Sequence, residues 1–171
     1  MLWPRLALAY AMTGRGAEAD TLIAKTPLDG DVCVLMRGQI AAARRDWTAV
    51  ARWYDLLARR SPSIPLANTA WGEALLAKGD LDGAIAKLVL AHRKNPHFAD
   101  PLELWGEALV RKGDYAGAVT KFAEADKHAP RWGRNHLRWG QALARLGKTD
   151  ETNAQWRAAS GWTFRLRTGR S

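Results

Sequence analysis

The side chains best suited to metal binding are few and scattered along the sequence. They are one cysteine, Cys33, and four histidines, His92, His97, His128 and His136. No two of these histidines stand four residues apart beside an acidic residue, which is the arrangement that helical zinc sites use. A single cysteine also cannot form an internal disulfide or a cysteine-built metal site. The sequence therefore predicts no metal centre and no cofactor.

The candidate nucleophiles and acid–base groups also lack a catalytic setting. The serines are Ser61, Ser63, Ser160 and Ser171. None of them stands in a nucleophile-elbow motif, and the glycines are spaced one per turn instead of clustered as in a phosphate-binding loop. Three carboxylates, Glu73, Glu103 and Glu107, could face one another, but a solvated binding surface explains them equally well. The sequence therefore predicts a protein that is not an enzyme.

A tryptophan–glycine pair recurs every 34 residues. It occurs at Trp71-Gly72, Trp105-Gly106 and Trp139-Gly140. Two further sets keep the same spacing, the glycines Gly79, Gly113 and Gly147 and the alanines Ala91, Ala125 and Ala159. A period of this length is typical of a repeated pair of helices. The elements that position any functional side chain are therefore expected to be helices.

The repeats resemble the tetratricopeptide repeat family over nearly the whole chain. The family pattern, Trp-x2-Leu-Gly-x2-Tyr followed by Ala, an aromatic residue, Ala and Pro, is matched in the first repeat by Trp3, Leu6, Ala7 and Tyr10. The third repeat matches at Gly72, Leu75, Ala84, Leu88, Ala91 and Pro96, and the fourth at Gly106, Leu109, Ala118, Phe122, Ala125 and Pro130. The later tryptophans depart from the pattern, because they occupy the family's leucine position.

The resemblance implies an all-α fold, a right-handed α-solenoid of about five antiparallel helix pairs. The expected repeats cover residues 1–30, 31–64, 65–98, 99–132 and 133–160, followed by a basic tail at 161–171 in which helical spacing is lost. Small residues such as Gly72 are expected to let the two helices of a pair approach closely. Trp71 and Leu88 are expected to fill the space between successive repeats.

Five of the nine tryptophans fall on positions that the repeat pattern assigns to the core. They are Trp3, Trp71, Trp105, Trp139 and Trp156. Core packing is therefore expected for these five, whereas Trp132 and Trp162 are open to a role as exposed anchors for a partner.

In this family the first helix of each repeat lines a concave surface, so the resemblance also implies where a partner would bind. By the matched spacing, the candidate partner-binding residues on this surface are Thr69, Glu73, Glu103, Glu107, Arg111, Arg138, Gln141 and Arg145. We expect the glutamates to meet basic groups of the partner and the arginines to meet acidic ones. Family members that grip a terminal carboxylate use lysine and asparagine at such positions, and glutamates stand there in this chain. That clamp is predicted to be absent.

The positive charge is concentrated near the end of the sequence. Residues 131–171 hold nine Lys or Arg against two Asp or Glu, whereas the whole chain has a net charge of +9. The candidate polyanion-binding residues are Arg131, Arg134, Arg165, Arg167 and Arg170. Arginines interleaved with Trp132, Trp162 and Phe164 suit phosphate neutralisation and base stacking, so RNA or another polyanion is the alternative ligand.

The function predicted from the sequence is a non-catalytic scaffold that binds a peptide or helical segment of a protein partner in the concave groove. A further alternative is that the chain is an interaction module of a larger protein. No apolar run approaches the roughly 18 residues of a membrane span. A cytoplasmic location is expected, with a periplasmic or membrane-associated location within a larger protein left open, as is the oligomeric state.

Overall fold

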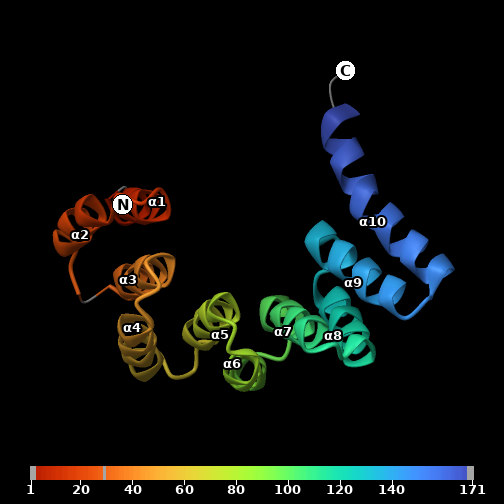
Figure 1. Cartoon of the computed structure of the whole chain (residues 1–171), viewed down its shortest axis with the longest axis horizontal. Helices are drawn as coiled ribbons and strands as arrows, with labels where there is room; N and C mark the ends of the chain where they lie inside the picture. Colours follow the sequence, from red (N-terminus) through yellow and green to blue (C-terminus); the bar gives the residue numbers. More distant parts are fainter. Residues whose placement is uncertain (1–2, 29, 169–171) are drawn as a thin grey trace. The chain divides into compact units, whose positions relative to one another are not determined.

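The computed structural model describes residues 3–28 and 30–168, with side chains up to Ser160. All regular structure in this part of the chain is helical (Figure 1). The helices are α1 (Trp3–Met12), α2 (Gly16–Ala24), α3 (Asp31–Ala43), α4 (Trp47–Arg60), α5 (Leu66–Lys78), α6 (Leu81–Lys94), α7 (Ala99–Lys112), α8 (Tyr115–His128), α9 (Gly133–Arg145) and α10 (Thr149–Thr168). The prediction of an all-α helical-repeat fold is confirmed.

The chain divides into two compact units. The N-unit, Met1–Lys94, contains α1 to α6, and the C-unit, Asn95–Ser171, contains α7 to α10. Within each unit the two helices of a pair pack against each other. In the N-unit α3 also packs against α1 and α5, and in the C-unit α9 packs against α7 and α8.

The turns inside the third and fourth helix pairs are each built by a glycine followed by an aspartate. Gly79 and Gly113 end α5 and α7 with a left-handed backbone, at φ of 88° and 83°. The aspartate that follows each glycine accepts a hydrogen bond from the backbone amide three residues further on, at 3.0 and 2.9 Å, and caps the next helix. In the second pair Arg45 takes the left-handed position with φ of 60°, a conformation that residues other than glycine seldom adopt. The turn geometry is therefore kept even where the glycine is replaced.

In the second to fifth pairs the two helices meet where a glycine of the first helix faces a large side chain of the second. The facing residues are Gly38 and Tyr54, Gly72 and Leu88, Gly106 and Phe122, and Gly140 and Trp156. A Cβ on any of these glycines would lie within 2.3 to 2.7 Å of the facing side chain, which is closer than carbon atoms can approach. Leu88 therefore fills the space within its pair, and the expectation that it separates successive repeats was wrong.

The tryptophans divide into two groups. Trp71 packs against a core cluster that includes Ala41, Val50 and Tyr54 of the preceding pair, so it does fill the space between repeats as expected. Trp3 and Trp156, however, are 57% and 43% exposed, and the prediction that they belong to the core was wrong. Trp156 covers Gly140 on one side only, because α10 packs against α9 alone among the described helices.

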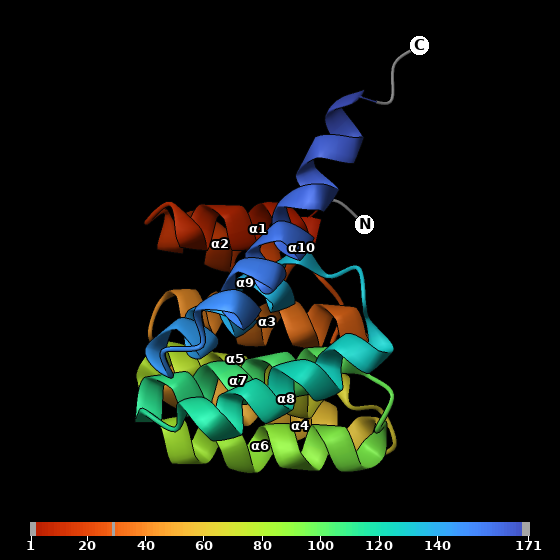
Figure 2. The same cartoon turned by 90° about the vertical axis from the view of Figure 1, so that its right-hand side faces the viewer.

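The end of α10 also differs from the expected tail. The helix continues through Thr168, past the end of α9, although the sequence from Gly161 alternates apolar and polar residues (Figure 2). The side chains of Trp162, Phe164, Arg165 and Arg167 lie outside the described part, as does all of Arg170. Their predicted roles stay predictions.

Candidate partner-binding groove

The first helices of the three N-unit pairs, α1, α3 and α5, follow one another side by side (Figures 1 and 2). Their exposed faces enclose a groove with a volume of about 420 Å³. It is lined by Leu8, Met12, Gln39, Ala42, Ala43, Tyr54, Ala70, Glu73, Ala74 and Ala77. Nine of these ten residues come from the three first helices, so the groove is a product of the repeat stacking.

The spacing of the lining residues explains why the groove is hollow. On α5 they recur at Ala70, Glu73, Ala74 and Ala77, which are positions i, i+3, i+4 and i+7 of one helical face. Three of these four side chains are methyl groups, which leave room above the helix. The face is therefore concave because its residues are small: Ala70 and Ala74 are buried at the floor of the groove, and Glu73 and Ala77 are exposed at its edge.

Three groups give the groove its polarity. The Glu73 carboxylate is exposed and forms no ion pair with another described residue. The side-chain amide oxygen of Gln39, Oε1, is buried and has no hydrogen-bond partner in the described part of the chain. Burial raises the pKa of Tyr54 above its usual value, and the charge of Glu73 adds to the rise, so this residue stays a neutral phenol. The groove thus has an apolar wall and two hydrogen-bond acceptors, the Glu73 carboxylate and the Gln39 side-chain oxygen, that are available to a partner.

The structure corrects the predicted register of this face. Thr69 is only 6% exposed and its hydroxyl donates to the Pro65 carbonyl at 3.0 Å, so Thr69 does not line the groove. A helix turns by about 100° per residue, so an error of one position moves a side chain from the exposed face to the buried one. Glu73 is exposed and lines the groove, and its role in partner binding stays a prediction. The missed residues on α5 are alanines, and their i, i+3, i+4, i+7 spacing with Glu73 was the signal that could have found them.

In the C-unit the predicted acidic and basic residues meet each other. Glu103 of α7 is fully buried, and its carboxylate lies 3.0 Å from Arg134 Nη2 and 2.8 Å from Arg138 Nη1 of α9. Glu107 forms ion pairs with Arg111 and Arg138. The prediction that Glu103 faces outward was wrong. A partner that used Glu107, Arg111 or Arg138 would have to compete with these internal pairs.

The remaining candidates on α9 lie at the surface. Gln141 and Arg145 are exposed, three and seven residues after Arg138 on the same helical face. Arg131 is exposed as well, and the guanidinium of Arg134 stacks 4.7 Å from the centre of the Trp132 ring. Because Arg134 is already paired with Glu103, one of the arginines proposed for polyanion binding has an internal partner. The binding roles of these residues stay predictions.

The buried carboxylate of Glu103 should make stability depend on pH. Burial raises the pKa of Glu103 above its ordinary value of 4.5, although Arg138 and Arg134 oppose the rise. The folded state then binds the proton more tightly than the unfolded state does, so the contribution of Glu103 to stability falls as the pH rises above about 4.5. We expect Glu103→Gln to remove this component, so that the stability of the wild type relative to the variant is greatest at pH 4.5 and declines toward pH 7.

Urea unfolding of both proteins at several pH values measures that difference. Glu151→Gln, which removes an exposed carboxylate on α10, controls for net charge. A wild-type advantage that grows as the pH rises would contradict the assignment, because it would mean that the arginines outweigh burial.

His97, His128 and His136 make ring contacts or hydrogen bonds within the described residues. His97 and His128 meet edge to face with ring centres 5.1 Å apart. His136 of α9 has its Nδ1 atom 2.8 Å from the Gln155 side-chain oxygen and its Nε2 atom 3.0 Å from the Pro130 carbonyl. Within the described part no three His, Cys, Asp or Glu side chains gather as metal ligands. No helix described here is both long and apolar enough to cross a lipid bilayer.

Comparison with known proteins identifies the fold. No protein-family model matches the sequence, and no curated protein does. A crystal structure of MamA matches with a TM-score of 0.73 at 16% identity, over 93% of this chain and 95% of that one. A double mutant, MamA RS-1 ArsTM, gives 0.71 at 16% identity over 99% and 96%, and MamA MSR-1 gives 0.62 at 21% identity over 96% and 97%. MamA is a tetratricopeptide-like helical repeat protein, and at these identities the likeness shows that this chain shares its fold.

Proposed function

We propose that this chain is a non-catalytic interaction module whose N-unit groove binds a segment of a protein partner. The observation that carries the proposal is the groove itself, an apolar hollow of about 420 Å³ between α1, α3 and α5. Stacked helical repeats produce extended concave surfaces of this kind, and such surfaces bind extended or helical segments. The small side chains of α3 and α5 leave space that the chain does not fill from within.

The chemistry of the groove specifies the segment. Met12 is 73% exposed at its edge, and the alanines offer methyl groups, so the segment must bring aliphatic side chains to cover them. Glu73 is a carboxylate without an internal cation, which calls for one lysine or arginine on the segment. The unpartnered oxygen of Gln39 calls for a hydrogen-bond donor beside the aliphatic residues, since leaving it unpaired costs about 1–3 kcal/mol.

A peptide selection tests this assignment. A phage-displayed library of 12-residue peptides is selected on the immobilised protein, and the enriched peptides are expected to combine aliphatic residues with a lysine or arginine. Glu73→Lys is expected to weaken their binding about tenfold, because it places like charges opposite each other. Replacing the basic residue of the peptide by glutamate should restore binding to that variant.

The matched control is Glu18→Lys, which changes the charge on α2 by the same amount outside the groove. Enrichment of acidic peptides, or equal binding to the wild type and Glu73→Lys, would overturn the proposal. A loss of binding in the Glu18→Lys control as large as in Glu73→Lys would also overturn it, since the effect would then be one of net charge.

A further inference from the structure

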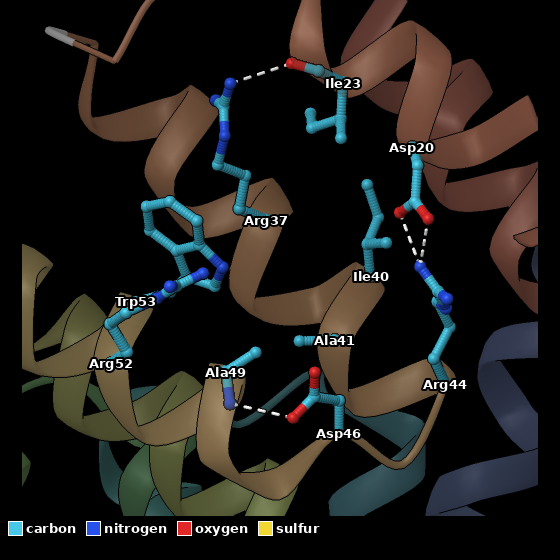
Figure 3. A pocket seen from close by; sticks show the side chains of 10 residues that line it. All are labelled: Asp20, Ile23, Arg37, Ile40, Ala41, Arg44, Asp46, Ala49, Arg52 and Trp53. Carbon is cyan, nitrogen blue, oxygen red and sulfur yellow. Dashed lines mark hydrogen bonds and ion pairs between the residues drawn. The ribbon is translucent and has the colours of Figure 1, made fainter. Parts of the chain in front are cut away.

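The N-unit has a second hollow, separate from the groove, between α2, α3 and α4 (Figure 3). Its volume is about 200 Å³. It is lined by Asp20, Ile23, Arg37, Ile40, Ala41, Arg44, Asp46, Ala49, Arg52 and Trp53. Three arginines and a tryptophan around an apolar floor are an unusual lining for a space that merely separates helices.

The hollow arises from an exchange of residue types in the second repeat. In the third and fourth repeats a tryptophan of the first helix lies against a lysine of the second, with Lys87 3.3 Å from the Trp71 ring centre and Lys121 4.1 Å from that of Trp105. In the second repeat the types are reversed. Arg37 stands 34 residues before Trp71, and Trp53 stands 34 residues before Lys87. The broad indole of Trp53 thus lies on the second helix. On the first helix the narrower side chain of Arg37 stands where the later repeats have a tryptophan.

Arg37 forms a fixed wall of the hollow. Its guanidinium donates to the backbone carbonyls of Ile23 at 2.8 Å and Thr26 at 3.0 Å, at the end of α2, and the side chain is buried. Figure 3 shows it directed upward, away from the centre of the hollow and toward Ile23. Arg37 therefore forms part of the wall of the hollow, and its hydrogen bonds go to the carbonyl groups at the end of α2.

The two carboxylates at the hollow are already engaged. Both oxygens of Asp20 accept hydrogen bonds from one nitrogen, Nη1, of Arg44. Asp46 caps α4 by accepting from the Ala49 amide at 3.0 Å. Arg52, by contrast, forms no ion pair with a described carboxylate, and its guanidinium stacks 4.5 Å from the centre of the Trp53 ring. One exposed cation, which lies against the Trp53 ring, thus remains at the rim without an ion pair to a described carboxylate.

We infer that this hollow binds a small organic carboxylate with a planar, apolar body. The carboxylate meets Arg52, and the planar body lies on Ile23, Ile40 and Ala49 beside the indole of Trp53. Arg44, which is paired with Asp20, lies at the opposite side of the hollow (Figure 3). The volume is below the roughly 300–1,000 Å³ of sites for drug-sized ligands, so the body is a single ring. A guanidinium bonds a carboxylate with two parallel hydrogen bonds, which supplies the selectivity for an acid. This site does not depend on the groove function.

The test uses benzoate as the probe, with benzamide and benzamidine as neutral and cationic analogues of the same shape. Calorimetric titration of the full chain is expected to give benzoate an affinity at least about tenfold above that of either analogue. In a ¹⁵N-labelled protein the indole N–H signal of Trp53 should shift on titration with benzoate. Arg52→Gln is expected to weaken benzoate binding about tenfold, while Arg59→Gln, which removes an exposed arginine of the same helix that pairs with Asp55, should leave it unchanged.

A free aromatic acid and the carboxyl-terminal aromatic residue of a polypeptide share this chemistry. N-acetylglycylphenylalanine distinguishes them, because tighter binding of this dipeptide than of benzoate assigns the site to a chain end, and weaker binding assigns it to a free acid. Equal affinity for benzoate and benzamidine, or full binding by Arg52→Gln, would overturn the inference. Because Arg52 is exposed, this variant should fold like the wild type.

Discussion

Replacing Phe122 by alanine is expected to lower the free energy of unfolding by about 3–5 kcal/mol, the range measured for buried aromatic residues. Phe122 is completely buried and fills the space left by the missing side chain of Gly106 on the facing helix. The cavity opens between α7 and α8, where Gly106 has no side chain that could fill it. Since 5–15 kcal/mol is the usual total for a folded protein, this change removes a large share.

Urea unfolding followed by circular dichroism measures the effect. Thr120→Ala, at an exposed position of the same helix, is the matched control and should change stability by less than about 0.5 kcal/mol. A loss below 1 kcal/mol for Phe122→Ala would contradict the view that the glycine–large residue contact holds each helix pair together.

Placing a tryptophan at Ala77 is expected to weaken binding of the selected peptides about 100-fold. Ala77 is exposed on the face of α5 that lines the groove, so a large side chain there fills the hollow without entering the core. The bound segment would lose most of its apolar contact, and a 100-fold loss corresponds to about 2.7 kcal/mol. Fluorescence anisotropy with a labelled peptide gives the dissociation constants.

Ala24→Trp adds the same bulk at an exposed position of α2, outside the groove, and should bind the peptides as the wild type does. Unchanged binding to Ala77→Trp would show that the peptides occupy another surface. A melting temperature equal to that of the wild type would establish that the variant is folded and that the comparison is valid.

The fold could be predicted because the residues that recur with the repeat period act through local interactions. Gly79 and Asp80 define a turn through backbone conformation and a single cap, and these depend on the nearest few residues. The same turn survives at Arg45 because the surrounding helices impose it.

The candidate site was harder to predict because it depends on which face of each helix points outward. Glu103 and Thr69 lie among buried neighbours on α7 and α5, and the sequence alone could not separate the buried face of these helices from the exposed one. The charges of Glu107 and Arg138 were assigned to a partner because the packing of α7 against α9, which makes them meet, is a tertiary contact. The groove itself consists largely of alanines, which carry no chemical signal until their spacing is placed on a helix.

The most direct test of the groove assignment is a methyl NMR titration. A protein with ¹³C-labelled alanine methyl groups is titrated with a selected peptide. The account predicts that the signals of Ala42, Ala74 and Ala77, which line the groove, shift strongly, while those of Ala84 and Ala91, buried in α6, stay in place. Shifts confined to alanines of α2, α4 or α6, with the groove signals unchanged, would contradict it.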